Sequence, residues 1–401
     1  MAGLNETPKG DRVHIAFFGL RNAGKSTLVN RLTGQDVAIV SDVAGTTTDP
    51  VSKAMEILPL GPCLVTDTAG LDDEGPLGEM RVKKSLDVLA TTDIAVWVED
   101  GGLGRARSPS GPEGGRLGEA TLQVYDRFLA ACRARDIAVL PYRRGDDVEA
   151  FRRELAAVRL ADAPRPLVGD LVSAGDLVVC VCPIDESAPK GRLILPQQQV
   201  VRELLDAGAS ALVCQPPQLA TILGRAVAPR PPNPLLPVKF VITDSQAFKA
   251  VAAVVPPEIP LTSFSIVFAR AKGDLAAYCA GADALAALKD GDRVLISEGC
   301  THHRQCNDIG TVKLPKWIMA KTGKKLAFEW TSGNSFPEDL SPYALVVHCG
   351  GCMLTRRAVQ ARIARCREAG VPITNYGVCI AACNGITASP DTCMVARVGA
   401  T

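Results

Sequence analysis

The chain has 401 residues and a formal net charge of +1 at pH 7, from 44 basic and 43 acidic residues. This near-balance gives no electrostatic reason to expect nucleic acid or an anionic membrane as a partner. Hydrophobic residues make up 47% of the chain and aromatic residues only 4%. The core must therefore be built from aliphatic side chains, which suits sheets covered by helices, and the length predicts two or three domains.

The first third of the chain alternates between predicted strands and predicted helices. Val13 to Gly19 reads as a short apolar strand that ends at a glycine-rich loop, and Lys25 to Leu32 reads as the helix that follows. Further strands are predicted at 63–66, 94–98 and 137–140, and a further helix at 120–135. This alternation predicts a parallel, doubly wound sheet.

A second and a third segment follow a proline-containing linker at 163–166. Strands are predicted at 175–183, 263–269, 293–297 and 343–347, and a helix with proline at its start at 196–207. We therefore expect an α/β protein of three domains, at 1–163, 164–258 and 259–401. The first would be a P-loop domain and the other two smaller α/β domains.

The loop after the first strand has the spacing of a phosphate-binding loop, Gly-x4-Gly-Lys-Ser, from Gly19 to Ser26. In such a loop the backbone N–H groups hold phosphates, Lys25 neutralises their charge and the Ser26 hydroxyl coordinates Mg²⁺. Asp67 follows the next buried strand and suits the Mg²⁺ site, while Gly70 lets the backbone approach a γ-phosphate. The expected nucleotide-binding residues are Gly19, Asn22, Ala23, Gly24, Lys25, Ser26, Thr27, Thr47, Asp67 and Gly70, with Lys25, Thr47 and Asp67 catalytic and Ser26 and Thr47 on Mg²⁺.

The N-terminal residues 1–12 are polar, and no run of 18 apolar residues occurs. A signal peptide and a membrane span are therefore not expected, and we expect a cytoplasmic protein. Fourteen cysteines are many for a compartment that disfavours disulfides. We expect some to be metal ligands and others, such as Cys180 and Cys182, to be small buried hydrophobic residues.

Cysteine and histidine occur together in two short segments, which begin at Cys300 and at His348. Both follow a predicted strand end, where ligands of open α/β sheets converge. The candidate metal ligands are Cys300, His302, His348, Cys349 and Cys352, with Cys306 in reserve. Three Cys and one His would form a closed tetrahedral zinc site, whereas three Cys alone can hold a [4Fe–4S] cluster with one exchangeable position. The residues by themselves favour neither metal, and Cys379, Cys383 and Cys393 read as core thiols or neighbours of the site.

Several motifs resemble known families. Three segments together resemble motifs of translation-factor-related GTPases: the phosphate-binding loop, Asp67-Thr-Ala-Gly70 and Gly45–Asp49. Within the loop, Asn22 resembles the residue found in the potassium-stimulated branch of that class. Cys-x-His, a gap of 45 residues and then His-Cys-x-x-Cys resembles the HydF family of [FeFe]-hydrogenase maturation GTPases. The segments 183–199, 243–248, 298–306, 329–333 and 375–377 are also similar to that family.

The resemblance implies a GTPase domain, a central dimerisation domain and a C-terminal cluster domain. It implies a [4Fe–4S] cluster on Cys300, Cys349 and Cys352, with His302 or His348 as the labile fourth ligand, and K⁺ beside Asn22. It further implies GTP/GDP with Mg²⁺, a transient di-iron subcluster precursor passed to apo-[FeFe]-hydrogenase, two radical-SAM maturases as partners and a homodimer. Neither nucleic acid nor a membrane is expected.

Two positions depart from the GTPase pattern. The guanine-specifying Asn-Lys-x-Asp is expected after the strand at 137–140, where the chain reads Pro141-Tyr-Arg-Arg-Gly-Asp146. Leu71 stands where some GTPases have a water-orienting Gln, which predicts slow hydrolysis. The alternatives are a zinc-stabilised regulatory GTPase acting in ribosome or tRNA biology, and a binding scaffold whose nucleotide site is vestigial.

Overall fold

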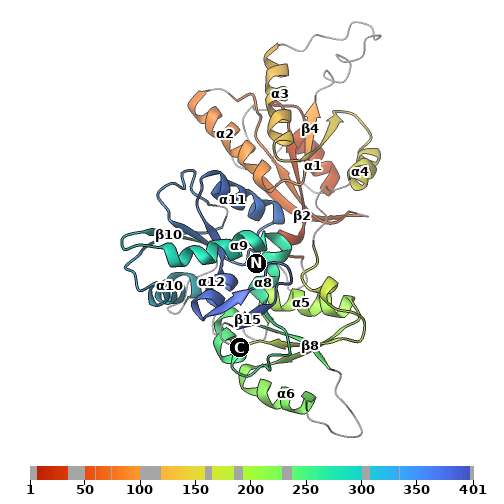
Figure 1. Cartoon of the computed structure of the whole chain (residues 1–401). Coiled ribbons are helices and arrows are strands. Elements are labelled where there is room, and N and C mark those ends of the chain that lie inside the picture. Colours follow the sequence, from red (N-terminus) through yellow and green to blue (C-terminus); the bar gives the residue numbers. More distant parts are fainter. Residues whose placement is uncertain are drawn as a thin grey trace. The chain divides into compact units, whose positions relative to one another are not determined.

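The computed structural model describes residues 7–34, 50–58, 60–73, 75–99, 119–158, 165–184, 193–227, 237–299, 308–333 and 335–397. The chain divides into two compact units, residues 1–163 and 164–401. Each unit alternates strands and helices along the chain, as the sequence predicts (Figure 1). Among the described residues, no helix has both the length and the hydropathy needed to cross a bilayer.

The first unit contains a five-stranded sheet in the order β2-β3-β1-β4-β5. The strands are β1 Val13–Phe18, β2 Val51–Ile57, β3 Gly61–Asp67, β4 Ile94–Glu99 and β5 Ala138–Arg143. The helices are α1 Lys25–Thr33, α2 Gly75–Asp87, α3 Glu119–Arg133 and α4 Val148–Ala157. β3, β1, β4 and β5 run parallel, and β2 is antiparallel to β3 at the edge.

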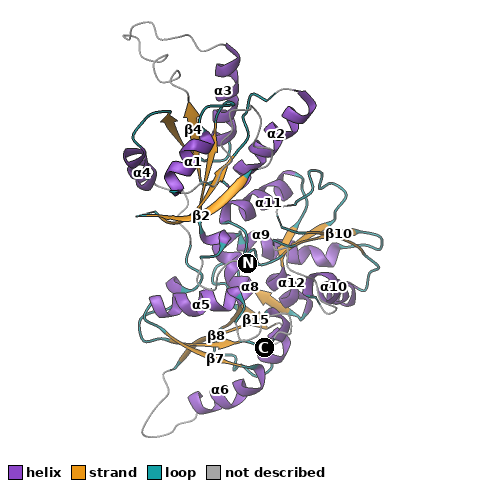
Figure 2. Cartoon of the chain, turned by 180° about the vertical axis from the view of Figure 1, so that it is seen from behind, coloured by secondary structure: helices purple, strands orange, loops and turns teal. Residues whose placement is uncertain are grey.

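Alternation along β1 sends its side chains into two separate cores. Ile15 and Phe17 pack with residues of α1 and α4, whereas Ala16 and Phe18 pack with Phe128 of α3 on the opposite face. Successive strand residues point to opposite faces, so a central strand of a sheet covered on both sides reads as a continuous apolar run. Figure 2 shows helices on both sides of this sheet.

The second unit contains two four-stranded parallel sheets. One has the order β7-β6-β8-β9, from β6 Leu177–Val181, β7 Ser210–Cys214, β8 Val238–Thr243 and β9 Leu261–Ser263. The other has the order β11-β10-β12-β13, from β10 Arg293–Ser297, β11 Ala327–Thr331, β12 Leu345–His348 and β13 Ile373–Asn375. A short antiparallel ladder joins β14 Ile386–Ala388 to β15 Val395–Arg397.

The helices of this unit are α5 Leu195–Asp206, α6 Leu219–Val227, α7 Phe248–Ala252, α8 Phe264–Lys272, α9 Leu275–Asp283, α10 Leu314–Thr322, α11 Arg356–Glu368 and α12 Tyr376–Cys383. The three sheets confirm the predicted α/β class.

One predicted strand is wrong. Residues 263–269 were expected to be extended, but Ser263 caps helix α8 by accepting a hydrogen bond from the backbone N–H of Ile266 (3.3 Å). Seven of the nine residues of α8 are buried. A helix that is buried on most of its surface shows little of the 3.6-residue periodicity that distinguishes it from a buried strand.

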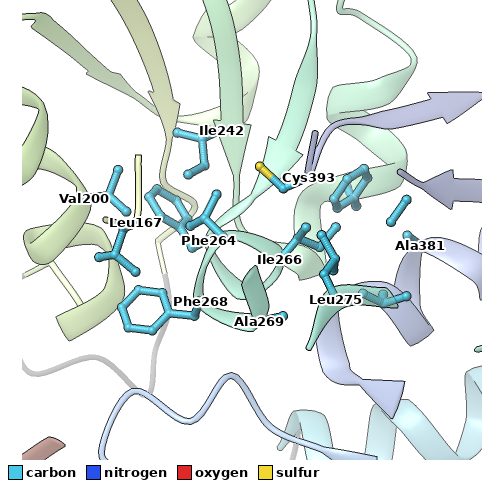
Figure 3. Packing of buried hydrophobic residues seen from close by; sticks show 14 of the residues in the cluster. Leu167, Val200, Ile242, Phe264, Ile266, Phe268, Ala269, Leu275, Ala381 and Cys393 are labelled. Carbon is cyan, nitrogen blue, oxygen red and sulfur yellow. The ribbon is translucent and has the colours of Figure 1, made fainter. Parts of the chain in front are cut away.

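Helix α8 lies in the middle of the largest hydrophobic core. Phe264 and Phe268 share this core with Leu167 and Val200, and the same core extends to Leu275. Figure 3 shows the side chains of α8 between these groups. The two sheets of the second unit are therefore packed around one helix. Cys180 and Cys182 are buried in this core, as expected.

Two glycines in helices of this unit provide a test of that packing. A Cβ on Gly281 in α9 would overlap the carbonyl group of Ile373 in β13, whereas a Cβ on Gly224 in α6 meets nothing within 4 Å. We predict that Gly281→Ala lowers the free energy of unfolding by about 1–3 kcal/mol through overpacking. Gly224→Ala should raise it by about 0.5–1 kcal/mol, because alanine has the better helix propensity.

Urea unfolding followed by circular dichroism measures both changes. If both substitutions changed the free energy of unfolding equally, the close approach of α9 to β13 would not restrict position 281 to glycine.

Candidate functional sites

The phosphate loop lies between β1 and α1, as the sequence predicts. Gly19 and Gly24 have φ values of 153° and 92°, and Asn22 has φ 58°. At Gly19 a Cβ would overlap the carbonyl oxygen of Val98 at the end of β4. Glycine is needed there because the loop passes directly over the neighbouring strand.

Lys25 is buried and bridges the loop from within. Its Nζ donates to the carbonyl oxygens of Gly19 (3.3 Å) and Leu20 (2.7 Å). Burial lowers the pKa of this ammonium group, and the charge of Asp67 opposes the shift. The lysine is thus held inside the loop that would surround the phosphates.

Ser26 and Asp67 form the other half of the site. The Ser26 Oγ donates to Asp67 Oδ2 over 2.6 Å, and Asp67 Oδ1 is buried without a hydrogen-bond partner. Burial raises the pKa of the Asp67 carboxyl, while the Ser26 hydrogen bond and Lys25 oppose the change. A buried carboxylate oxygen without a partner, next to a serine hydroxyl, fits the ligand set of Mg²⁺. When bound, the ion supplies charge neutralisation for the phosphates.

The segment after Asp67 closes against the loop. Leu71 donates its backbone N–H to the carbonyl of Gly19 (3.2 Å), and its apolar side chain is buried. Asp72 Oδ1 accepts from the backbone N–H of Arg21 (2.6 Å). A Cβ on Gly70 would lie 2.8 Å from that same nitrogen, so the close approach requires glycine. The side chains of Asn22 and Thr27 are exposed at the loop, and Ala23 is buried beneath it.

The segment where base recognition is expected lies at the end of β5, at the same edge of the sheet. Asp146 Oδ2 accepts from the backbone N–H of Arg143 (3.2 Å), and the Arg143 guanidinium lies 3.6 Å from Glu99 at the end of β4. The side chain of Arg144 lies against Gly24, with its Cδ 3.6 Å from the position of a Cβ there. The Arg144 side chain therefore lies against the phosphate loop, which the sequence did not indicate.

The second candidate site lies at the carboxyl ends of β10 and β12. These neighbouring parallel strands pair Ser297 with His348 in register, and each is the last residue of its strand. The backbone N–H of Cys349 donates to the carbonyl of Ser297 (2.9 Å). Both cysteine-bearing segments therefore leave the sheet at one point, as the predicted strand ends require.

The sulfur of Cys349 accepts two backbone hydrogen bonds. Gly299 donates from 3.0 Å and Gly351, which has φ 69°, from 3.4 Å. Burial raises the pKa of this thiol, and the two N–H groups oppose the rise. Backbone N–H groups directed at a sulfur stabilise a thiolate and are typical of the surroundings of iron–sulfur clusters. Gly299 directly precedes Cys300 in the chain, so this contact joins the two halves of the cysteine motif.

His348 is fully buried with both ring nitrogens engaged. Its Nε2 lies 3.1 Å from the guanidinium of Arg362, and its Nδ1 lies 2.7 Å from the carbonyl oxygen of Cys349. Because a guanidinium only donates, Nε2 accepts and the proton is on Nδ1. Burial lowers the pKa of the imidazole to about 3, with the charge of Arg362 adding to the shift.

Asn375 also supports the Cys349-x-x-Cys352 turn. Its Nδ2 donates to the carbonyl of Cys349 (3.2 Å), and its Oδ1 accepts from Ser265 of α8 (3.2 Å). Lys272, also in α8, donates its Nζ to the carbonyls of Cys352 (3.3 Å) and Leu354 (3.0 Å). Two polar side chains of α8 thereby support the Cys-x-x-Cys turn.

Several predicted site residues lie outside the described part of the chain, namely Thr47, Cys300, His302 and Cys306. Within the described part, no group of three or more Cys, His, Asp or Glu residues is arranged to hold a metal ion. Cys379 and Cys393 are fully buried core residues, and Cys379 is hydrogen-bonded to the partly exposed Cys383. Sequence reasoning missed Arg362 altogether, because an arginine in a hydrophilic helix gives no sign of burial.

Family patterns match three successive parts of the chain. The pattern of the hydrogen maturase F dimerization domain matches residues 167–273, and that of the hydrogen maturase F tetramerization domain matches residues 276–389. Together these two patterns cover more than half of the chain. The chain belongs to the hydrogen maturase F (HydF) family. The part that the sequence predicts to carry a cluster thus corresponds to the tetramerization domain of HydF.

The first unit is a P-loop GTPase domain. The pattern of the 50S ribosome-binding GTPase family matches residues 14–133. The chain is 34% identical over 169 residues to the tRNA modification GTPase MnmE of Paramagnetospirillum magneticum, covering 39% of this chain and 37% of MnmE. It is 45% identical over 98 residues to GTPase Der of Xylella fastidiosa, covering 23% and 21%. The chain thus spans well under half the length of these curated relatives. A GTPase domain implies GTP as the nucleotide.

Similarity to solved structures is weak. A crystal structure of an Aquifex aeolicus Era variant bound to GDP·AlF4⁻ has a TM-score of 0.25 and 17% identity, covering 50% of this chain and 91% of that chain. A crystal structure of an S. thermophilus NFeoB variant, also bound to GDP·AlF4⁻, has a TM-score of 0.24 and 18% identity, covering 37% of this chain and 51% of that chain. At these scores neither structure contributes to the assignment.

The Ser26–Asp67 pair leads to a prediction for nucleotide binding. We expect Ser26→Ala to weaken binding of a fluorescent GDP analogue by about tenfold in the presence of Mg²⁺, because the ion loses a ligand. Binding in EDTA should be unchanged. Thr33→Ala is the matched control, since this hydroxyl lies at the far end of α1 and donates to the carbonyls of Val29 and Asn30 in its own helix. An equal loss with and without Mg²⁺ would contradict the role of Ser26 at the metal.

Proposed function

We propose that this protein is an [FeFe]-hydrogenase maturation scaffold. Cys300, Cys349 and Cys352 would hold a [4Fe–4S] cluster, and the chain would carry the di-iron subcluster precursor and deliver it to apo-hydrogenase. When bound, the cluster would supply an iron with an exchangeable position for that cargo. The observation that carries this proposal is the hydrogen bond from Gly299 to the sulfur of Cys349, because it brings the neighbour of Cys300 against the first cysteine of the Cys-x-x-Cys turn.

The histidines differ in what they can contribute as a labile ligand. Both nitrogens of His348 are engaged, and its ligation would require the break of the contact with Arg362 or with the Cys349 carbonyl. We therefore favour His302 over His348 for the fourth position. In this arrangement His348 orients the Cys-x-x-Cys turn through the Cys349 carbonyl instead of binding iron.

The GTPase domain would act as a slow switch. Leu71 offers no polar atom to orient a water molecule, and Asn22 lies in the loop where it would help hold K⁺. We propose that hydrolysis is slow and stimulated by K⁺, and that Thr47 joins Ser26 at Mg²⁺. The nucleotide state would bias association with the hydrogenase and with the two radical-SAM maturases in the cytoplasm.

We further propose a division into residues 1–163, 164–258 and 259–401, and assembly as a homo-oligomer. The support for assembly is that the two family patterns of the second unit belong to a dimerization and a tetramerization domain. A dimer formed through the middle part of the chain would be its basic form.

Guanine recognition is proposed for Asp146. The order Arg143-Arg-Gly-Asp146 places an aspartate where the family pattern Asn-Lys-x-Asp ends, and Arg144 takes the place of the lysine against Gly24. A carboxylate can accept both N–H groups at the edge of guanine. This would preserve the base specificity that the changed motif puts in question.

The cluster assignment is tested by anaerobic reconstitution with iron and sulfide, followed by EPR of the reduced protein. We expect a [4Fe–4S]⁺ signal in the wild type that is lost in Cys349→Ser, because serine is a poor ligand for this cluster. Cys279→Ser is the control, since this cysteine is also partly buried and its thiol contacts only the Ala388 carbonyl among the described hydrogen bonds. Stoichiometric zinc without an iron signal would instead support a zinc-stabilised regulatory GTPase.

Base recognition is tested by nucleotide competition. We expect Asp146→Asn to weaken GDP binding at least tenfold and to improve binding of xanthosine diphosphate, whose 2-carbonyl can accept from the new amide. Asp147→Asn, one residue on, should change neither affinity, because Asp147 caps α4 through the backbone N–H of Glu149. Unchanged selectivity in Asp146→Asn would refute the assignment.

A further inference from the structure

Arg362 is a buried cation surrounded by neutral acceptors. Its side chain is 5% exposed, and it donates to His348 Nε2 (3.1 Å), Ser297 Oγ (3.2 Å) and the carbonyl of Gly333 (2.6 Å). The ring of Phe336 covers it at 5.2 Å. A buried charge is costly unless an opposite charge lies close by.

No carboxylate of the described residues supplies that opposite charge. The groups near the guanidinium that can become anionic are the Cys349 and Cys366 thiols and the Tyr278 phenol. Cys366 and Tyr278 are buried in the hydrophobic core. Cys349 is the one of the three whose sulfur accepts backbone N–H groups and that belongs to the Cys-x-x-Cys turn, so it is the one that lies in the proposed cluster site.

The position of Arg362 relates it to the whole cysteine site. Its two side-chain partners, Ser297 and His348, are the register-paired last residues of β10 and β12. From Ser297 the chain continues through the buried Glu298 to Gly299, and from His348 it continues directly to Cys349. The guanidinium is therefore hydrogen-bonded to the last residue of each of the two strands that lead into the cysteine-bearing segments.

A cluster on three thiolates has a net negative charge, and reduction adds one more electron. A fixed positive charge nearby stabilises the reduced form more than the oxidised form, and therefore raises the reduction potential. We propose that Arg362 is the built-in counter-charge of the cluster site, a positioning residue that raises the reduction potential of the cluster. This proposal rests on the proposed function.

The test is an EPR-monitored redox titration of the reconstituted wild type, Arg362→Met and Arg362→Lys. Methionine keeps much of the length and removes the charge, whereas lysine keeps the charge and loses the planar fork. At a fixed potential we expect the ratio of reduced to oxidised cluster in Arg362→Met to fall about tenfold, which is 59 mV for a one-electron couple. Arg362→Lys should shift by much less.

Arg365→Met is the matched control. Arg365 lies one turn along α11, contacts the same Phe336 ring at 5.1 Å and donates to the carbonyl of Pro337, without a described bond to His348 or Ser297. Its potential should remain near that of the wild type. Thermal unfolding of each apo-variant shows whether it is folded before loading.

The outcomes distinguish failure of the proposed function from failure of the role proposed for Arg362. A wild type without a cluster would refute the proposed function itself. A loaded wild type and a loaded Arg362→Met variant with equal potentials would overturn the counter-charge role alone, as would an equal shift in Arg365→Met. Loss of the cluster from both folded Arg362 variants would make the residue structural, whereas loss from the methionine variant alone would support the need for its charge.

Discussion

The burial of helix α8, seven of whose nine residues are buried, is the constraint on which the second unit depends. Phe264, Ile266 and Phe268 are almost completely buried, and burial of each such side chain contributes about 1.5–3 kcal/mol. The helix follows directly from β9 of one sheet and packs against elements that surround the other. Displacement of α8 would open the core that the two sheets share.

The same helix connects packing to the cysteine site. Its polar residues Ser265 and Lys272 bond to Asn375 and to carbonyls of the 352–354 segment, so they point away from the apolar core toward the Cys-x-x-Cys turn. A site whose supports come from a rigid buried helix keeps its geometry better than one supported by loops alone. The core of the unit and the shape of the site are therefore determined by one element.

Both candidate sites use the carboxyl ends of parallel strands. In the first unit the ends of β1, β3, β4 and β5 position the phosphate loop, Asp67, Glu99 and the 143–146 segment. In the second unit the ends of β10 and β12 position Gly299 and Cys349. Burial has opposite consequences at the two sites. A cation would stabilise the buried Asp67 Oδ1, and an anion would stabilise the buried Arg362 guanidinium.

The sequence by itself determined the α/β class, the phosphate loop with its following helix, and the two strand ends that carry the cysteines. These features depend on short-range patterns, such as glycine and lysine spacing or an apolar run that stops at a polar residue. It did not determine helix α8, because a helix that is buried on most of its surface and a buried strand have similar sequences. Tertiary structure alone decided the tautomer of His348, the seating of Arg144 on Gly24 and the burial of Arg362. Each of these depends on a contact between residues that only the packed fold brings together.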